Sequence, residues 1–264
     1  MNPHDMSATL KNARVVILIK ALPNPSQKYG ETVCCAGVTA EGQWKRLFPV
    51  RFRQLKEAKF QRWDWVQFDY RLPRSDNRVE SCHVYEDRLT VIRPLKRSAE
   101  RAALLNPIIL PSTSEAAARG QSLALVRPQT PRFRARRKPS IIIEAERDAY
   151  KKAARQKSFL DEELAAIEPV PFEFAFTWSD ADGPHTMRCG DWETTAWFWR
   201  RRHDIGESKA LEEMYGRYNE EYPRSGVVFA LGTMKKRPKT WTLLGVIRLD
   251  PLTEAQRRQA SLPL

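Results

Sequence analysis

The sequence lacks the motifs that mark several common enzyme classes. Neither a GxxxxGKS/T phosphate loop nor a GxGxxG fingerprint occurs in its 264 residues, which argues against ATP and dinucleotide sites. The HxE and PCxxC motifs of base deaminases are absent, as are the PD…(D/E)xK, HNH and DEDD patterns of nucleases. The sequence therefore assigns no reaction, and it favours a protein that is not an enzyme.

Cysteine is scarce, and its spacing argues against metal sites and disulfides. The four cysteines include no CxxC pair, the spacing typical of structural zinc sites. Cys82 and His83 are adjacent, so in a strand they point to opposite faces. Cys34 and Cys35 are expected in a strand, with at least one thiol in the core. We expect no metal, no cofactor and no disulfide framework, and hence a reducing compartment.

Long apolar runs are also missing. The longest lies near residues 15–19 and is far too short to span a bilayer. The N-terminus lacks the charged and then apolar plan of a signal peptide. We expect a cytoplasmic protein with no membrane partner.

Positive charge, in contrast, is in excess. Lysine and arginine number 45 against 32 aspartates and glutamates, which gives a formal net charge of +13. Such an excess favours polyanionic partners, and nucleic acid comes first among them. The sequence does not distinguish DNA from RNA.

The pattern of apolar residues predicts an α+β protein in three parts. Residues 1–93 contain about five β-branched or alternating runs, which predict a small curved sheet or a partly open barrel. Residues 94–140 carry repeated prolines and a basic run, which predict a linker or arm. Residues 141–264 predict a mixed-charge helix at 144–166 and then a β-β-α-α-β-β unit.

One stretch of the third part is especially dense in functional side chains. It runs from Pro184 through a histidine, a cysteine, two carboxylates and three tryptophans to three arginines ending at residue 202. Asp191 is expected to cap a helix over residues 191–203. An i, i+4, i+7, i+11 stripe, which predicts the core face of this helix, is formed by Trp192, Ala196, Trp199 and His203.

The chain resembles an uncharacterised bacterial protein family. The resemblance rests on ETVCCAGVT and WKRLFPVRFR near the N-terminus, and on a histidine, DWE and VVFALGT…PKTWTLLGVI in the C-terminal third. The family pattern has cysteines just before the histidine, whereas residues 178–184 here contain none. The resemblance implies no activity.

A composite basic surface is the functional feature that the sequence predicts best. Basic segments recur with an aromatic residue in or beside each, a combination suited to neutralising phosphates and stacking on bases. We therefore expect a nucleic-acid-binding protein, non-catalytic or an accessory subunit. The candidate binding residues are Arg46, Arg51, Arg53, Arg127, Arg132, Phe133, Arg134, Arg136, Arg137, Lys138, Arg200, Arg201, Arg202, Lys235, Lys236, Arg237 and Lys239.

Two alternatives remain open. His185, Asp191 and Glu193 lie close in sequence, as the catalytic residues of a metal-dependent nuclease would, and that enzyme would require Mg²⁺ or Mn²⁺. Each also has a structural explanation, because Asp191 suits a helix cap and Glu193 suits the first helical turn. The other alternative is a subunit of a larger complex that docks on an acidic protein through the basic arm.

Overall fold

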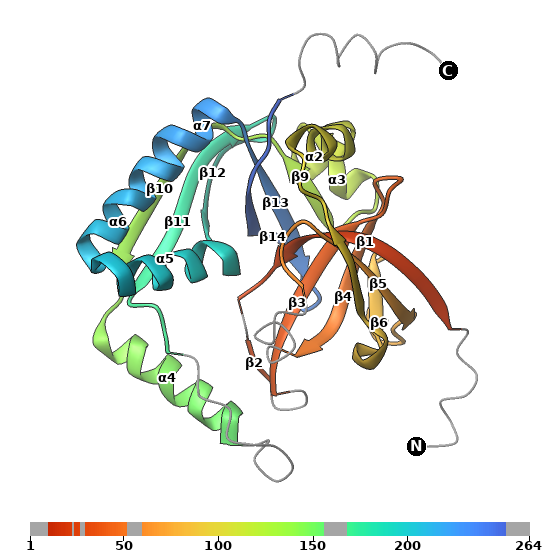
Figure 1. Ribbon diagram of the computed structural model, residues 1–264, viewed down its shortest axis with the longest axis horizontal. Coiled ribbons are helices and arrows are strands. Elements are labelled where there is room, and N and C mark those ends of the chain that lie inside the picture. Colours follow the sequence, from red (N-terminus) through yellow and green to blue (C-terminus); the bar gives the residue numbers. More distant parts are fainter. Residues whose placement is uncertain (1–9, 23, 27–29, 52–59, 156–167, 252–264) are drawn as a thin grey trace.

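The computed structural model describes residues 10–22, 24–26, 30–51, 60–155 and 168–251. The protein is an α+β structure, as the sequence predicts. A β-barrel formed by the N-terminal strands lies beside a half built from strands and helices, which curves around one side of the barrel (Figure 1).

The barrel is closed and has five strands. Its strand order is β1-β3-β4-β6-β5, and β5 pairs back with β1, so that no edge remains open between them. The β4–β6 pair is parallel, whereas β1–β5 is antiparallel. The five strands are β1 (Lys11–Lys20), β3 (Gly30–Val38), β4 (Trp44–Arg51), β5 (Asp64–Arg71) and β6 (Ser81–Val84). Two short strands extend the sheet, namely β2 (Asn24–Ser26) beside β3 and β7 (Thr90–Pro94) beside β5.

Strand β1 is buried on both faces from Val15 onward, which explains the continuous apolar run from Val15 to Ile19. Val15 and Ile17 point into the barrel interior. Val16, Leu18 and Ile19 point outward and pack with residues of the C-terminal half. A strand with two buried faces needs apolar residues at every position rather than at alternate ones.

The segment 94–140 is not the linker or arm that its prolines predict. It folds into α2 (Ser98–Leu105), β8 (Ile109–Leu110), α3 (Thr113–Ala118), β9 (Leu123–Val126) and β10 (Gln129–Arg137). All four side chains of β9 are fully buried, between β8 and β13 (Val227–Met234). The prolines lie at element ends and on β10, and the short apolar runs between them supply the core contacts that order the segment.

The C-terminal half has the predicted β-β-α-α-β-β order. Its elements are β11 (Phe172–Asp180), β12 (Gly183–Arg188), α5 (Trp192–Ile205), α6 (Glu207–Gly216), β13 and β14 (Arg237–Arg248), with a π-helical turn (Arg217–Glu221) and α7 (Tyr222–Ser225) after α6. A preceding helix, α4 (Ser140–Arg155), starts before its predicted residue 144, and its predicted continuation over 156–167 lies outside the described residues. The sheets are β10-β11-β12 and β14-β13-β9-β8.

Phe133, predicted to stack on bases, lies in the core instead. It is 1% exposed, and its ring lies 5.2–5.6 Å from those of Phe174, Phe176, Tyr215 and Tyr218. The backbone N–H of Phe133 also donates to Asn219 Oδ1 over 2.6 Å. The alternation of β10 places Phe133 inward and the arginines on either side of it outward.

The buried face of α5 also differs from the predicted stripe. Its buried residues are Thr194, Thr195 and Phe198, whereas Trp192 and Trp199 are half-buried and His203 is exposed. Phe198 packs edge-on against Phe172 and Phe174 of β11, and this contact sets the rotation of the helix.

Within the part of the chain that the structure describes, no helix has both the length and the apolar character needed to cross a bilayer.

Phe133→Ala is expected to lower the free energy of unfolding by about 3–5 kcal/mol, because it opens a cavity among four rings. Urea unfolding monitored by circular dichroism measures this change. Phe133→Leu is the matched control and is expected to cost less, since it retains most of the apolar volume. A change within about 0.5 kcal/mol for the alanine variant would be the behaviour of a surface residue and would contradict the buried position.

Candidate functional site

A buried ion pair joins the barrel to the C-terminal half. Arg62, which precedes β5, donates from Nη2 to Asp191 Oδ1 over 2.5 Å. The same guanidinium donates to the backbone carbonyls of Leu18 on β1 and Val246 on β14. Asp191 is fully buried and caps α5 by accepting from Glu193 N. We call this group of contacts the Arg62–Asp191 clamp.

Glu193 forms a second ion pair beside the clamp. Its carboxylate accepts a 2.9 Å hydrogen bond from Lys20 at the end of β1. Burial alone would raise the pKa of Glu193, but the positive charges of Arg62 and Lys20 lower it below its ordinary value. Burial likewise disfavours the charge of Arg62, yet Asp191 and Glu193 raise the pKa of its guanidinium. For Asp191 the balance is the opposite, because its complete burial raises the pKa of the carboxyl above its ordinary value against the lowering effect of Arg62.

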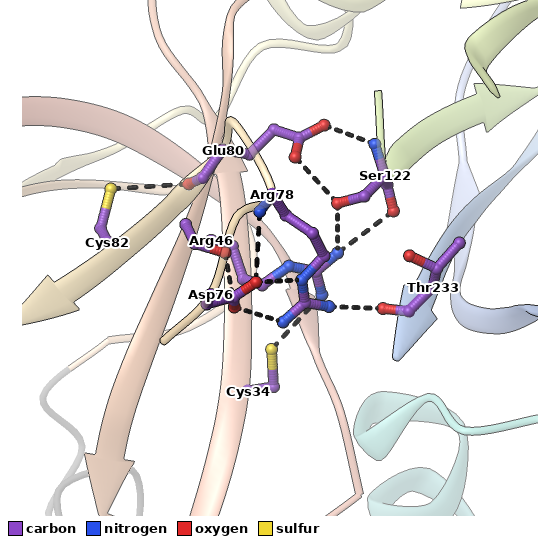
Figure 2. Close-up of polar contacts among 9 residues, drawn as sticks. Cys34, Arg46, Asp76, Arg78, Glu80, Cys82, Ser122 and Thr233 are labelled. Atoms are coloured by element: carbon purple, nitrogen blue, oxygen red, sulfur yellow. Dashed lines mark hydrogen bonds and ion pairs between the residues drawn. The ribbon is translucent and has the colours of Figure 1, made fainter. Parts of the chain in front are cut away.

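A polar network joins the two halves at a second place (Figure 2). Arg46 of β4 donates from Nη2 to the backbone oxygen and to Oγ of Ser122, each over 3.1 Å. Ser122 in turn donates from its backbone N and from Oγ to the carboxylate of Glu80. Arg78 donates to the backbone oxygen of Thr233 over 2.6 Å. Asp76 holds Arg78 in place, and these contacts lower the pKa of Asp76 to about 2 against the effect of burial.

Between the clamp and this network lies a cavity of about 970 Å³, which we call the groove. One wall is the outer face of β3 and β4, represented by Cys34, Arg46 and Phe48. Trp192 and Trp199 of α5 and Tyr150 of α4 also line the groove, and Trp192 packs in addition against the apolar core of the barrel. A cavity of this size with aromatic walls and a few polar groups is typical of a ligand site.

The barrel wall of the groove is the surface that this topology commonly uses for binding. A five-stranded barrel in the order 1-2-3-5-4, closed by strands 1 and 4, has the topology of the OB-fold. OB-folds bind oligonucleotides and oligosaccharides on the face of their second and third strands, between the loops that follow strands 1 and 4. Those strands here are β3 and β4, and the flanking residues that line the groove include Ala21, Leu22 and Ser75.

Most charges inside the groove are neutralised by partners. Arg78 pairs with Asp76, Lys138 with Glu146, and Arg188 with Glu173. Arg46 has no carboxylate partner among the described residues, and its buried Nε has no hydrogen-bond acceptor there. The guanidinium lies close to the Cys34 thiol, with Nη1 3.6 Å from Sγ.

The turn between β13 and β14 brings cations to the mouth of the groove. We call residues 234–239 the basic finger. Met234 and Lys235 line the groove, and all six residues of the finger are exposed. No ion pair links Lys235, Lys236, Arg237 or Lys239 to another residue within the described ranges. These cations are therefore available to a phosphate group.

The other predicted binding residues have varied surroundings. Arg132, Arg134 and Arg200 are exposed. Arg46 is 3% exposed, and Arg127 donates to Asn106 Oδ1. Other candidates form ion pairs with carboxylates. The pairs are Arg136 with Glu173, Arg137 with Glu207, Arg202 with Glu207, Lys138 with Glu146, and Arg201 with Glu213. Arg53 and the side chain of Arg51 lie outside what the structure describes.

The three residues of the nuclease alternative are each engaged in other contacts. His185 Nε2 lies 2.7 Å from Asp180 Oδ1, and its ring stacks on Trp178. Asp191 is enclosed in the clamp, and Glu193 is held by Lys20. Among the described residues, no three histidine, cysteine, aspartate or glutamate side chains gather as a metal site would require. His185, Asp191 and Glu193 therefore do not form the metal centre that the nuclease hypothesis requires.

The sequence does not reveal that Trp192, Trp199 and Cys34 line the groove. The helical stripe predicts core positions for both tryptophans, and Trp192 does pack against the barrel core while it also lines the groove. The vicinal cysteines offered a signal, since alternation must direct one of the two away from the barrel interior. Cys35 is fully buried there, and Cys34 faces the groove.

Comparisons with known proteins identify the family. Residues 109–263 match the family model described as "Domain of unknown function (DUF8757)", which covers more than half of the chain, and the chain belongs to that family. Residues 11–107 match the model described as "Domain of unknown function (DUF8758)". No curated protein matches the chain.

One solved structure is similar over most of the chain. Its title is "Structure and Conformational Change of a Replication Protein A Heterotrimer Bound to ssDNA", and the match has 8% sequence identity. It covers 96% of this chain and 68% of the other, with a TM-score of 0.25.

Of the four cysteines, Cys34 is expected to react first with a maleimide under native conditions. It is half-buried at the groove, whereas burial raises the pKa of Cys82 and of Cys189 to about 12, and Cys35 is fully buried. The thiolate is the reactive form, so these three react slowly. Peptide mapping after brief labelling measures the order, with urea-unfolded protein as the control in which all four react. Labelling of Cys82 or Cys189 before Cys34 would contradict the geometry of the groove.

Glu193→Gln is expected to destabilise the protein at neutral pH, with a loss that diminishes on acidification. The folded-state pKa of Glu193 is below its ordinary value of 4.5, so its contribution to stability is present above pH 4.5 and disappears as pH falls through the folded value. Urea unfolding of both proteins at pH values above and below 4.5 measures the difference. A difference that is independent of pH would show that the Lys20 ion pair does not cause it.

Proposed function

We propose that the protein binds single-stranded nucleic acid in the groove, with bases against the aromatic walls and the backbone along the basic finger. The observation that carries this proposal is the position of the groove on the β3–β4 face of an OB-type barrel, with the exposed cations of the basic finger at its mouth. Fold alone does not establish function. The chemistry of the groove provides the independent support.

The groove suits bases better than it suits a duplex backbone. Its walls carry Phe48, Trp192 and Trp199, whose side chains offer apolar and aromatic contact. Most of its cations already have carboxylate partners, so the interior is poorly suited to a row of phosphates. Stacking of a base on an aromatic side chain contributes about 1–3 kcal/mol and requires an unpaired strand.

Phosphates are better accommodated at the mouth. The basic finger has four cations without a described partner, and the net charge of +13 adds long-range attraction for a polyanion. DNA and RNA are equal candidates, because stacking on bases and attraction of phosphates do not depend on whether the sugar is ribose or deoxyribose. The protein acts here as a binding module and not as an enzyme.

A double variant of the finger tests the proposal. Lys235→Ala/Arg237→Ala is expected to weaken binding of a labelled single strand, and to reduce the slope of log affinity against log salt by about 1.4, or 0.7 per phosphate contact. Fluorescence anisotropy over a salt series with single-stranded DNA, single-stranded RNA and duplex measures both quantities. The matched control is Arg93→Ala/Lys96→Ala, which removes one arginine and one lysine that are exposed and do not line the groove.

The control variant distinguishes binding at the groove from general electrostatic attraction by the net charge of the protein. An equal loss in the finger and control variants would mean that net charge alone attracts the polyanion and would overturn the groove assignment. Absence of binding to every probe, or binding that does not depend on salt, would overturn the proposal as a whole. A preference for duplex over both single strands would contradict base stacking in the groove.

A further inference from the structure

The outer face of the β10-β11-β12 sheet carries four arginines. Arg132, Arg134 and Arg136 alternate along β10 with inward residues and are exposed. In the register of the sheet, Arg134 lies opposite Ala175, which lies opposite Arg188 on β12. Glu173, opposite Arg136, is the single carboxylate among the strand residues of this face. The face therefore has a large local excess of positive charge.

That one carboxylate is shared, which leaves two arginines unpaired. Glu173 lies 3.5 Å from Arg136 and 2.7 Å from Arg188. Arg132 and Arg134 have no ion pair with any residue in the described ranges, and both are exposed. An exposed guanidinium without a carboxylate partner binds phosphate oxygens in a bidentate manner at little desolvation cost.

The centre of the face is made of short side chains. Ala175 and Thr177 of β11 lie between the arginines of β10 and the strand β12, where Thr186 is opposite Thr177. Long cationic side chains along the rim and short ones in the middle form a shallow trough. The free edge of β10 is closed to an added strand, because Tyr215 and Asn219 accept its N–H groups at Ala135 and Phe133. A partner must therefore bind to the face and not to the edge.

The trough is continuous with the groove. Glu173 and Arg188 line the groove and also stand at one end of the trough. From Arg136, which lies opposite Glu173, Arg134 and then Arg132 follow along β10 at a spacing of about 6.6 Å, and Arg188 lies at the level of Arg134 on the far side of β11. A chain that leaves the groove beside Glu173 and Arg188 thus meets Arg134 and then Arg132, neither of which has an ion pair within the described ranges.

We propose that the trough is a second phosphate-binding track, which holds the backbone of the same nucleic-acid strand after it leaves the groove. This inference rests on the proposed function of the groove and extends its substrate class to strands that are longer than the groove itself. The groove contacts bases, and the trough contacts the backbone without regard to sequence.

A length series tests this track. Single strands of about 4 and about 16 nucleotides represent the short and long ends of OB-fold site sizes. Arg132→Ala/Arg134→Ala is expected to reduce the salt slope for the long strand by about 1.4 and to leave the short strand unchanged. Arg93→Ala/Lys96→Ala removes two exposed cations elsewhere that have no ion pair within the described ranges, and it is the matched control, expected to change neither. Anisotropy titrations provide all the values.

A variant that tightens binding provides a second test, because a misfolded protein would not bind more tightly. Glu173→Gln removes the one carboxylate of the trough and is expected to tighten binding of the long strand. Unchanged or weaker binding would count against the track. If both strands bind the natural protein but the Arg132/Arg134 variant affects them equally or not at all, the track is wrong and the groove stands. If neither strand binds the natural protein, the proposed function itself fails.

Discussion

The Arg62–Asp191 clamp is the interaction on which the rest of the arrangement depends. One guanidinium contacts β1, β14 and the start of α5, and its partner carboxylate is completely excluded from solvent. Removing one partner of a buried ion pair costs about 3–5 kcal/mol, because the remaining charge is uncompensated. The clamp therefore holds the start of α5, with the groove residue Trp192, against the barrel.

The pairing of charges differs between the groove and the surface around it. Ion pairs inside the groove neutralise Arg78, Lys138 and Arg188, so that the interior remains compatible with bases. The basic finger and the β10 residues Arg132 and Arg134 lack such partners in the described chain and remain available to a polyanion. Net charge alone could not have revealed this division, since it sums paired and unpaired cations alike.

The sequence predicted the fold better than it predicted the site, and particular residues show why. The α+β class, the barrel strands and the β-β-α-α-β-β order follow from short-range periodicity, which local propensity and burial determine together. The linker prediction failed because prolines at the element ends of 94–140 concealed short apolar runs such as Leu123–Val126. Phe133 lies in the core and Trp199 lies off the buried face of α5, both contrary to prediction, because periodicity does not tell which side of a strand or helix another element will cover. The groove exists only between two halves, so no local pattern contains it.

The first family model ends at residue 107 and the second begins at residue 109, but β1 packs against residues of both parts. The strand belongs by sequence to the first model, and one of its faces forms the interior of the barrel while the other is part of the core of the second half. A barrel without the second half would expose Val16, Leu18 and Ile19 to water as an apolar patch that is prone to association. Wherever the barrel occurs without the second half, another apolar surface has to cover this face of β1.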